Sequence, residues 1–161
     1  MNSRDEIFQQ FVKKWVDAEY LPSTVNPGPL DAAERELGLL PAAYREFILR
    51  FGWVQIEQSL TNAALSAKDF LEPIYHFLAP MELSAEMRSL RQLGLKRGYV
   101  PIATNGGGDY FCLKPSDSLK GRADDSPVYF FLHEERNIGK VAPSFQEWLR
   151  SYANLSASAP A

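Results

Sequence analysis

Few side chains in this sequence could take part in catalysis, and their spacing matches no familiar catalytic motif. The two histidines, His76 and His133, lie outside the H-E-x-x-H spacing of zinc-binding helices. The single cysteine, Cys112, lies in an apolar stretch, where a buried and unreactive thiol is expected. A Cys–His nucleophile pair is the alternative, but reactive cysteines need an accessible, electropositive setting. We therefore predict no catalytic residue, no metal site and no cofactor, and we expect that the chain is not an enzyme.

The most informative stretch is residues 101–113, PIATNGGGDYFCL, where two apolar runs flank Gly106, Gly107, Gly108 and Asp109. Glycine accepts positive φ angles, and an aspartate can cap the backbone of a turn. The stretch predicts two strands joined by a tight turn, with the Asp109 carboxylate bonded to backbone N–H groups of the glycines. The alternative is a loop that binds an anion through these N–H groups. No helix and no G-x-x-x-x-G-K-[ST] motif follows the glycines, which favours the structural turn.

Composition predicts one soluble domain with a substantial core. The chain has 161 residues, of which 45% are hydrophobic, and its formal net charge is −3. Basic residues cluster only around positions 88–97, which indicates a solvated helix face more than a nucleic-acid or phosphate site. The lone cysteine, the absence of an apolar signal core and the lack of a run of about 20 apolar residues favour a cytoplasmic protein. We expect no direct nucleic-acid or membrane partner, and the acidic balance suits a basic protein.

Apolar periodicity predicts helices in the first half of the chain and at its C-terminal end. The clearest helical pattern is Tyr44, Phe47, Ile48 and Phe51, which fall at i, i+3, i+4 and i+7. Proline at the start and glycine after the end delimit two of the helices. The predicted helices begin near Ser3, Pro29, Pro41, Ser84 and Ser144.

The predicted strands lie mainly in the second half of the chain. Alternation suggests a short strand over residues 53–57, and apolar runs suggest strands over 100–104, 110–113, 128–133 and 138–141. The run over 128–133 is expected to be a central strand and the run over 138–141 an edge strand. Residues 58–80 are expected to be irregular, with Phe70, Ile74 and Phe77 anchored in the core. Residues 1–153 are predicted to form the domain and 154–161 a flexible tail.

Three groups of motifs, in this order, resemble the SMI1/KNR4 family of the SUKH superfamily. The resemblance extends from about Leu30 to Leu149, and the family often carries Asn-Gly where this chain has Phe51-Gly52. The matching residues are Leu37-Gly38-Leu39-Leu40-Pro41 with Tyr44 and Phe47-Ile48; Ile102-Ala103 with Gly107-Gly108-Asp109-Tyr110-Phe111; and Pro127-Val128-Tyr129 with His133, Val141-Ala142, Ser144-Phe145 and Trp148-Leu149.

This resemblance implies an α+β domain in which helices pack against an antiparallel or mixed sheet. Many bacterial members of the family resemble immunity proteins, which bind and neutralise a toxin that is frequently a nuclease. Fungal relatives act as regulatory interaction proteins, and no catalytic residues are known for the family. Two hypotheses follow: a stoichiometric inhibitor of a cognate toxin, and a regulatory or scaffolding module with no toxin partner.

A nuclease inhibitor is expected to present acidic side chains, because a nuclease site that holds phosphate is usually basic. The candidate partner-binding residues are Glu57, Asp124, Asp125, Glu134 and Glu135. Asp124-Asp125 precedes the predicted central strand and Glu134-Glu135 follows it, so we expect the two pairs at opposite ends of the sheet. We favour Glu134-Glu135 together with Glu57 as the patch. The alternative is that all five are solvated loop charges.

Overall fold

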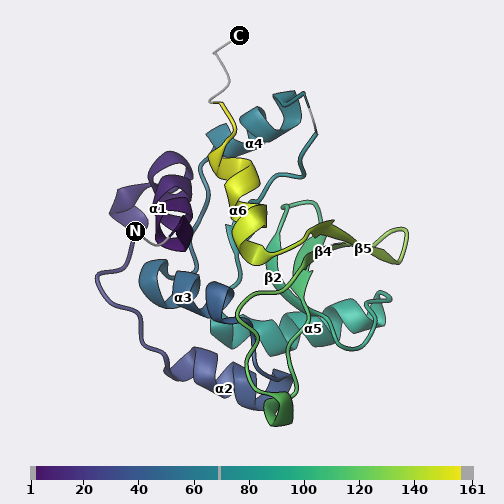
Figure 1. Ribbon diagram of the computed structural model, residues 1–161. Coiled ribbons are helices and arrows are strands. Elements are labelled where there is room, and N and C mark those ends of the chain that lie inside the picture. Colours follow the sequence, from purple (N-terminus) through teal and green to yellow (C-terminus); the bar gives the residue numbers. More distant parts are fainter. Residues whose placement is uncertain (1–2, 69, 157–161) are drawn as a thin grey trace.

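An antiparallel sheet forms the centre of the molecule, and helices cover both of its faces (Figure 1). The computed structural model describes residues 3–68 and 70–156. The five strands pair in chain order, so the sheet is a simple meander. The strands are β1 His76–Phe77, β2 Val100–Thr104, β3 Tyr110–Leu113, β4 Val128–Leu132 and β5 Asn137–Ala142. This is the α+β architecture that the sequence predicts.

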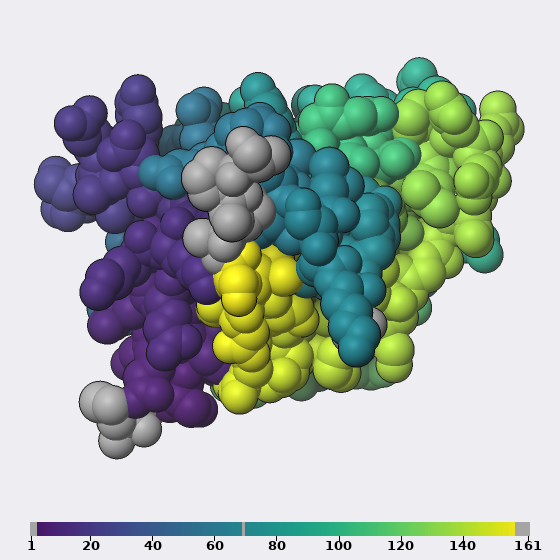
Figure 2. Space-filling model, turned by 90° about the horizontal axis from the view of Figure 1, so that it is seen from above, coloured from purple at the N-terminus to yellow at the C-terminus, as the bar shows by residue number. Residues whose placement is uncertain are grey.

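The helices begin and end close to the residues that the sequence indicates. Helix α3 follows Pro41 and ends at Gly52, and the Ser144 hydroxyl accepts a hydrogen bond from the Glu147 N–H at the start of α6 (3.0 Å). Seen from above, α6 lies between α1 and α4 (Figure 2). The α-helices are α1 Ser3–Trp15, α2 Gly28–Leu37, α3 Ala42–Phe51, α4 Gln58–Ser66, α5 Leu83–Gln92 and α6 Phe145–Ala153; the 3-10 helices are η1 Ala18–Tyr20, η2 Pro80–Glu82 and η3 Ser118–Lys120.

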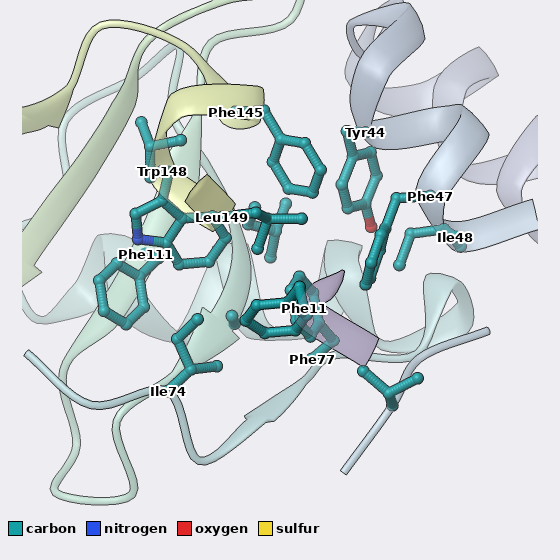
Figure 3. Packing of buried hydrophobic residues seen from close by; sticks show 14 of the residues in the cluster. Phe11, Tyr44, Phe47, Ile48, Ile74, Phe77, Phe111, Phe145, Trp148 and Leu149 are labelled. Carbon is teal, nitrogen blue, oxygen red and sulfur yellow. The ribbon is translucent and has the colours of Figure 1, made fainter. Parts of the chain in front are cut away.

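The main core lies between one face of the sheet and helices α1, α3 and α6 (Figure 3). Phe47 is at its centre, with ring centroids 5.2 Å from Phe77, 5.3 Å from Phe8 and 5.8 Å from Phe145. From the sheet, Phe111 packs on Trp148 of α6 at 4.8 Å. The apolar stripes of three helices therefore meet the inward residues of the strands in a single aromatic cluster.

The opposite face of the sheet carries a smaller core beneath α5. Its fully buried members are Leu90 and Leu95 on the helical side and Cys112 and Phe131 on the sheet side. Adjacent residues in β3 and β4 therefore face different cores, and the prediction of a central β4 is confirmed because β3 and β5 flank it. None of the helices in the described part of the chain has the length and apolar character that a membrane span requires.

The prediction for residues 58–80 is wrong in part. This segment contains α4 and the short strand β1, and Phe70 is 60% exposed, although Ile74 and Phe77 are buried as expected. Residues 53–57 alternate in burial as predicted but form only isolated bridges, such as Gln55 with His76. At the C-terminal end, Leu155 packs against the core, and residues 157–161 of the predicted tail lie outside the described residues.

Candidate functional site

The glycine turn joins β2 to β3, and side chains at its start hold its backbone. The Asn105 side-chain oxygen accepts hydrogen bonds from the backbone N–H groups of Gly107 (2.8 Å) and Asp109 (3.2 Å). The Thr104 hydroxyl accepts one from the N–H of Gly106 (3.1 Å). These contacts satisfy the N–H groups of Gly106, Gly107 and Asp109 within the protein, so the turn does not offer these three amides to an anion.

The Asp109 carboxylate does not cap the glycine amides, which corrects the expectation from the sequence. Its Oδ1 accepts a hydrogen bond from the backbone N–H of His133 (2.9 Å) and lies 2.6 Å from His133 Nδ1. The reason is positional, since the Asn105 side chain reaches forward over the turn, while Asp109, directly before β3, contacts His133 at the end of the neighbouring strand β4. Asp109 therefore joins the β2–β3 hairpin to the end of β4.

Gly108 is required where the histidine ring crosses this turn. Its φ is +93°, and a Cβ added to it would lie 2.7 Å from Cε1 of His133. A side chain at this position would displace the imidazole and strain the backbone. The glycines, Asp109 and His133 thus form one packed unit at this end of the sheet.

We expect Asp109→Ala to lower the free energy of unfolding by about 1–2 kcal/mol, because His133 loses two hydrogen bonds with a carboxylate. Thermal unfolding followed by circular dichroism measures the loss. Asp117→Ala is the matched control, because Asp117 caps only the short helix η3 through the Leu119 N–H (2.9 Å). An Asp109→Ala protein as stable as the control variant would show that the pair does not hold the hairpin.

The Asp109–His133 pair resembles the orienting half of an acid–base site, but it lacks a nucleophile. In the part of the chain that the structure describes, no hydroxyl or thiol hydrogen-bonds to His133. His76 lies elsewhere, in β1, with its Nδ1 3.0 Å from the carbonyl of Phe77. Among the described residues, no group of three histidine, cysteine or acidic side chains could hold a metal ion.

Two groups near this end of the sheet remain protonated at neutral pH. Cys112 lies on β3 and is buried in the smaller core beneath α5, and burial raises the pKa of its thiol. Burial, followed by the hydrogen bond from its hydroxyl to Glu86 (3.0 Å), raises the pKa of Tyr110 to about 12. Neither group is activated as a nucleophile, since a thiolate or phenolate forms readily only where the pKa is lowered.

Two of the five acidic candidates have contacts with distant parts of the fold, whereas Glu57 accepts a hydrogen bond from the hydroxyl of Ser59, two residues later (3.4 Å). The Asp125 carboxylate accepts hydrogen bonds from the N–H groups of Ser126 (2.7 Å), Phe145 (2.8 Å) and Gln146 (3.2 Å), which stabilises the start of α6. Asp124 forms an ion pair with Arg4 at 2.5 Å. Asp125 therefore has a structural role, and Asp124 links the chain before β4 to α1.

The remaining acidic candidates are exposed, but the structure does not bring them together. Glu134 and Glu135 lie in the turn between β4 and β5, beside Arg136. Glu57 lies past the opposite edge of the sheet, two residues after Gln55, which bridges to β1. Four strand spacings, about 19 Å, separate the segment of Gln55 from β4. Asp124-Asp125 and Glu134-Glu135 lie at opposite ends of β4.

A cavity of about 180 Å³, lined in part by residues 51–54, was not expected from the sequence. Tyr20 and Trp53 line it, and they are 71% and 41% exposed. The signal that could have indicated this surface is charge, because residues 15–34 and 51–67 contain no lysine or arginine.

Most of the chain matches the sequence model of one known protein family. The sequence model of the SMI1 / KNR4 family (SUKH-1) matches residues 24–151. The match covers α2 through most of α6 and includes the glycine turn, Asp109 and His133. No curated protein matches the chain. The chain therefore belongs to the SMI1/KNR4 family, SUKH-1.

Proposed function

We propose that this protein is an immunity-type protein that binds and neutralises a cognate bacterial toxin by stoichiometric protein–protein interaction. The observation that carries the proposal is membership of the SMI1/KNR4 family over residues 24–151. A binding role agrees with the site, because the His133 ring is hydrogen-bonded to Asp109 and the buried Cys112 thiol is out of reach of a substrate. A nuclease is the toxin class that we favour, since an acidic inhibitor complements a basic phosphate-binding site.

The proposal predicts protection of a cell that produces the toxin. We expect co-expression of this chain with the toxin domain encoded in the neighbouring reading frame to restore growth by several orders of magnitude in colony number. The matched control is the same plasmid with a stop codon in place of Trp15, which yields no folded domain. Equal killing with both plasmids, with the full chain present in soluble form, would contradict neutralisation and favour the regulatory or scaffolding alternative.

A further inference from the structure

Two chain segments that lie side by side in the fold carry acidic and aromatic side chains. Residues 15–34 and 51–67 contain no lysine or arginine, and the fold brings the two segments together. Val16 bridges to Ile56, and the Glu57 N–H donates a hydrogen bond to the carbonyl of Trp15 (2.8 Å). This places Asp17 and Glu19 on the chain segment next to Glu57. Both segments lack basic residues, and the bridge between Val16 and Ile56 brings their acidic residues close together.

The aromatic part of this surface is the cavity between Tyr20 and Trp53. Its wall is fixed, because Pro22 packs on Gly52, where an added Cβ would lie 3.0 Å from the proline Cγ. Gly52 also has a φ of +79°, which a larger residue would resist. Phe51 completes the aromatic lining. The cavity therefore has two exposed aromatic residues in its lining and a wall that the contact between Pro22 and Gly52 supports.

Exposed and buried side chains alternate along residues 53–57, the segment that begins at the pocket. Trp53, Gln55 and Glu57 are exposed, while Val54 is buried and Ile56 is half-buried. The carboxylate of Glu57 therefore lies on the same exposed side of this segment as Trp53, four residues further along the chain. The neighbouring Arg50 lies over the ring of Phe51, which lines the cavity, at 5.0 Å, and its charge is paired with Asp5 at 3.5 Å.

We propose that this surface, defined by Asp17, Glu19, Tyr20, Trp53 and Glu57, docks a basic protein partner through a side-chain cation. An arginine or lysine of the partner enters the cavity between Tyr20 and Trp53, where the aromatic faces attract it. The three carboxylates steer the basic partner and pair with its flanking charges. Tyrosine and tryptophan are also the residues that most often supply binding energy at interfaces. The proposal rests on the proposed function in identifying the partner as a basic toxin domain.

The Glu134-Glu135 turn suits such a partner less well because Arg136 is next to the pair and packs near a basic stretch of the chain. Arg136 follows the pair directly, and its side chain lies against Gly94 at the end of α5, 3.1 Å from the position of an added Cβ. Arg91 and Lys96 flank Gly94 in sequence. A basic partner would meet repulsion there, whereas Arg50, the cation beside the pocket of Trp53, is paired with Asp5.

Nuclear magnetic resonance with a peptide probe tests the surface without the toxin. The probe is the peptide Gly-Arg-Gly-Arg-Gly, and its matched control is Gly-Glu-Gly-Glu-Gly. We expect the arginine peptide to shift the indole N–H signal of Trp53 in a saturable manner and to leave the buried Trp15 and Trp148 unmoved. Tyr20→Ala should lower the affinity for the arginine peptide about 3–10-fold, the range expected for the loss of a cation–π contact. Shifts centred on Glu134-Glu135, or equal shifts with the glutamate peptide, would overturn the proposal.

A second experiment uses the toxin domain itself and separates this proposal from the function. The double variant Tyr20→Ala with Trp53→Ala should bind the toxin domain at least about 30-fold more weakly, as expected for interface hot spots. Leu119→Ala is the control, because Leu119 is 92% exposed and lies on η3, outside this surface. Wild-type affinity of the double variant, in a protein that still protects cells, would overturn this surface and leave the proposed function intact. Absence of protection by the wild-type chain would contradict the function, and the peptide experiment would still decide the surface.

Discussion

Phe47→Ala is expected to lower the free energy of unfolding by about 3–5 kcal/mol, the cost of removing a large aromatic side chain from a packed core. Phe47 is fully buried at the centre of the core, with Phe77 and Phe8 within 5.3 Å between ring centroids. The loss is a large share of the roughly 5–15 kcal/mol that stabilises a typical domain. Urea unfolding followed by circular dichroism measures the effect.

The control for this prediction is Phe70→Ala, which removes the same side chain from a position that is 60% exposed. We expect it to change stability by less than about 1 kcal/mol. Equal losses for Phe47→Ala and Phe70→Ala would contradict the assignment of the main core to the face of the sheet that α3 and α6 cover.

Glu34→Ala is expected to lower the free energy of unfolding by about 3 kcal/mol, because the guanidinium groups of Arg45 and Arg122 lose their buried carboxylate partner. The Glu34 carboxylate is buried and binds three segments at once. It forms an ion pair with Arg45 on α3 at 2.6 Å, pairs with Arg122, and accepts a hydrogen bond from the Leu40 N–H at 2.8 Å. The contact with Arg122 holds the long connection before β4 against α2. The free energy of unfolding from urea titration measures the loss.

Glu36→Ala is the matched control on the same helix. The Glu36 carboxylate is exposed and pairs with Arg88 at 3.0 Å, so we expect its removal to cost less than about 1 kcal/mol. If Glu34→Ala is no more destabilising than Glu36→Ala, the buried carboxylate does not hold the three segments together.

The helices were predictable because their signals are local. Proline and glycine delimit α2 and α3, and the spacing from Tyr44 to Phe51 specifies one buried face. Helix α4 was missed because its sequence, QSLTNAALS, has only two large apolar residues, Leu60 and Leu65, and no side-chain cap. Strand β1 has only two residues, and it forms because β2 offers a partner. Such elements depend on tertiary contacts that a local pattern does not encode.

The candidate site shows the same division between local and long-range information. The sequence identified Asp109 as a structural residue, but its partner His133 is 24 residues away and could not be read from turn geometry. It also placed Asp125 among the surface charges, although Asp125 caps α6 across 20 residues. The sequence gives the charge at each position, but it does not show which charged residues lie on the same surface. The pocket of Tyr20 and Trp53 depends on the pairing of two distant segments.

A titration of the toxin domain with this protein tests the central claim most directly. Stoichiometric binding predicts that residual toxin activity falls linearly and reaches its minimum at one molecule of this protein per toxin, with no further change over time. The toxin domain should also be recovered active when the complex is dissociated. Progressive loss of toxin activity at a tenth of that ratio, with covalent change in the toxin, would contradict the account and show that the protein turns over.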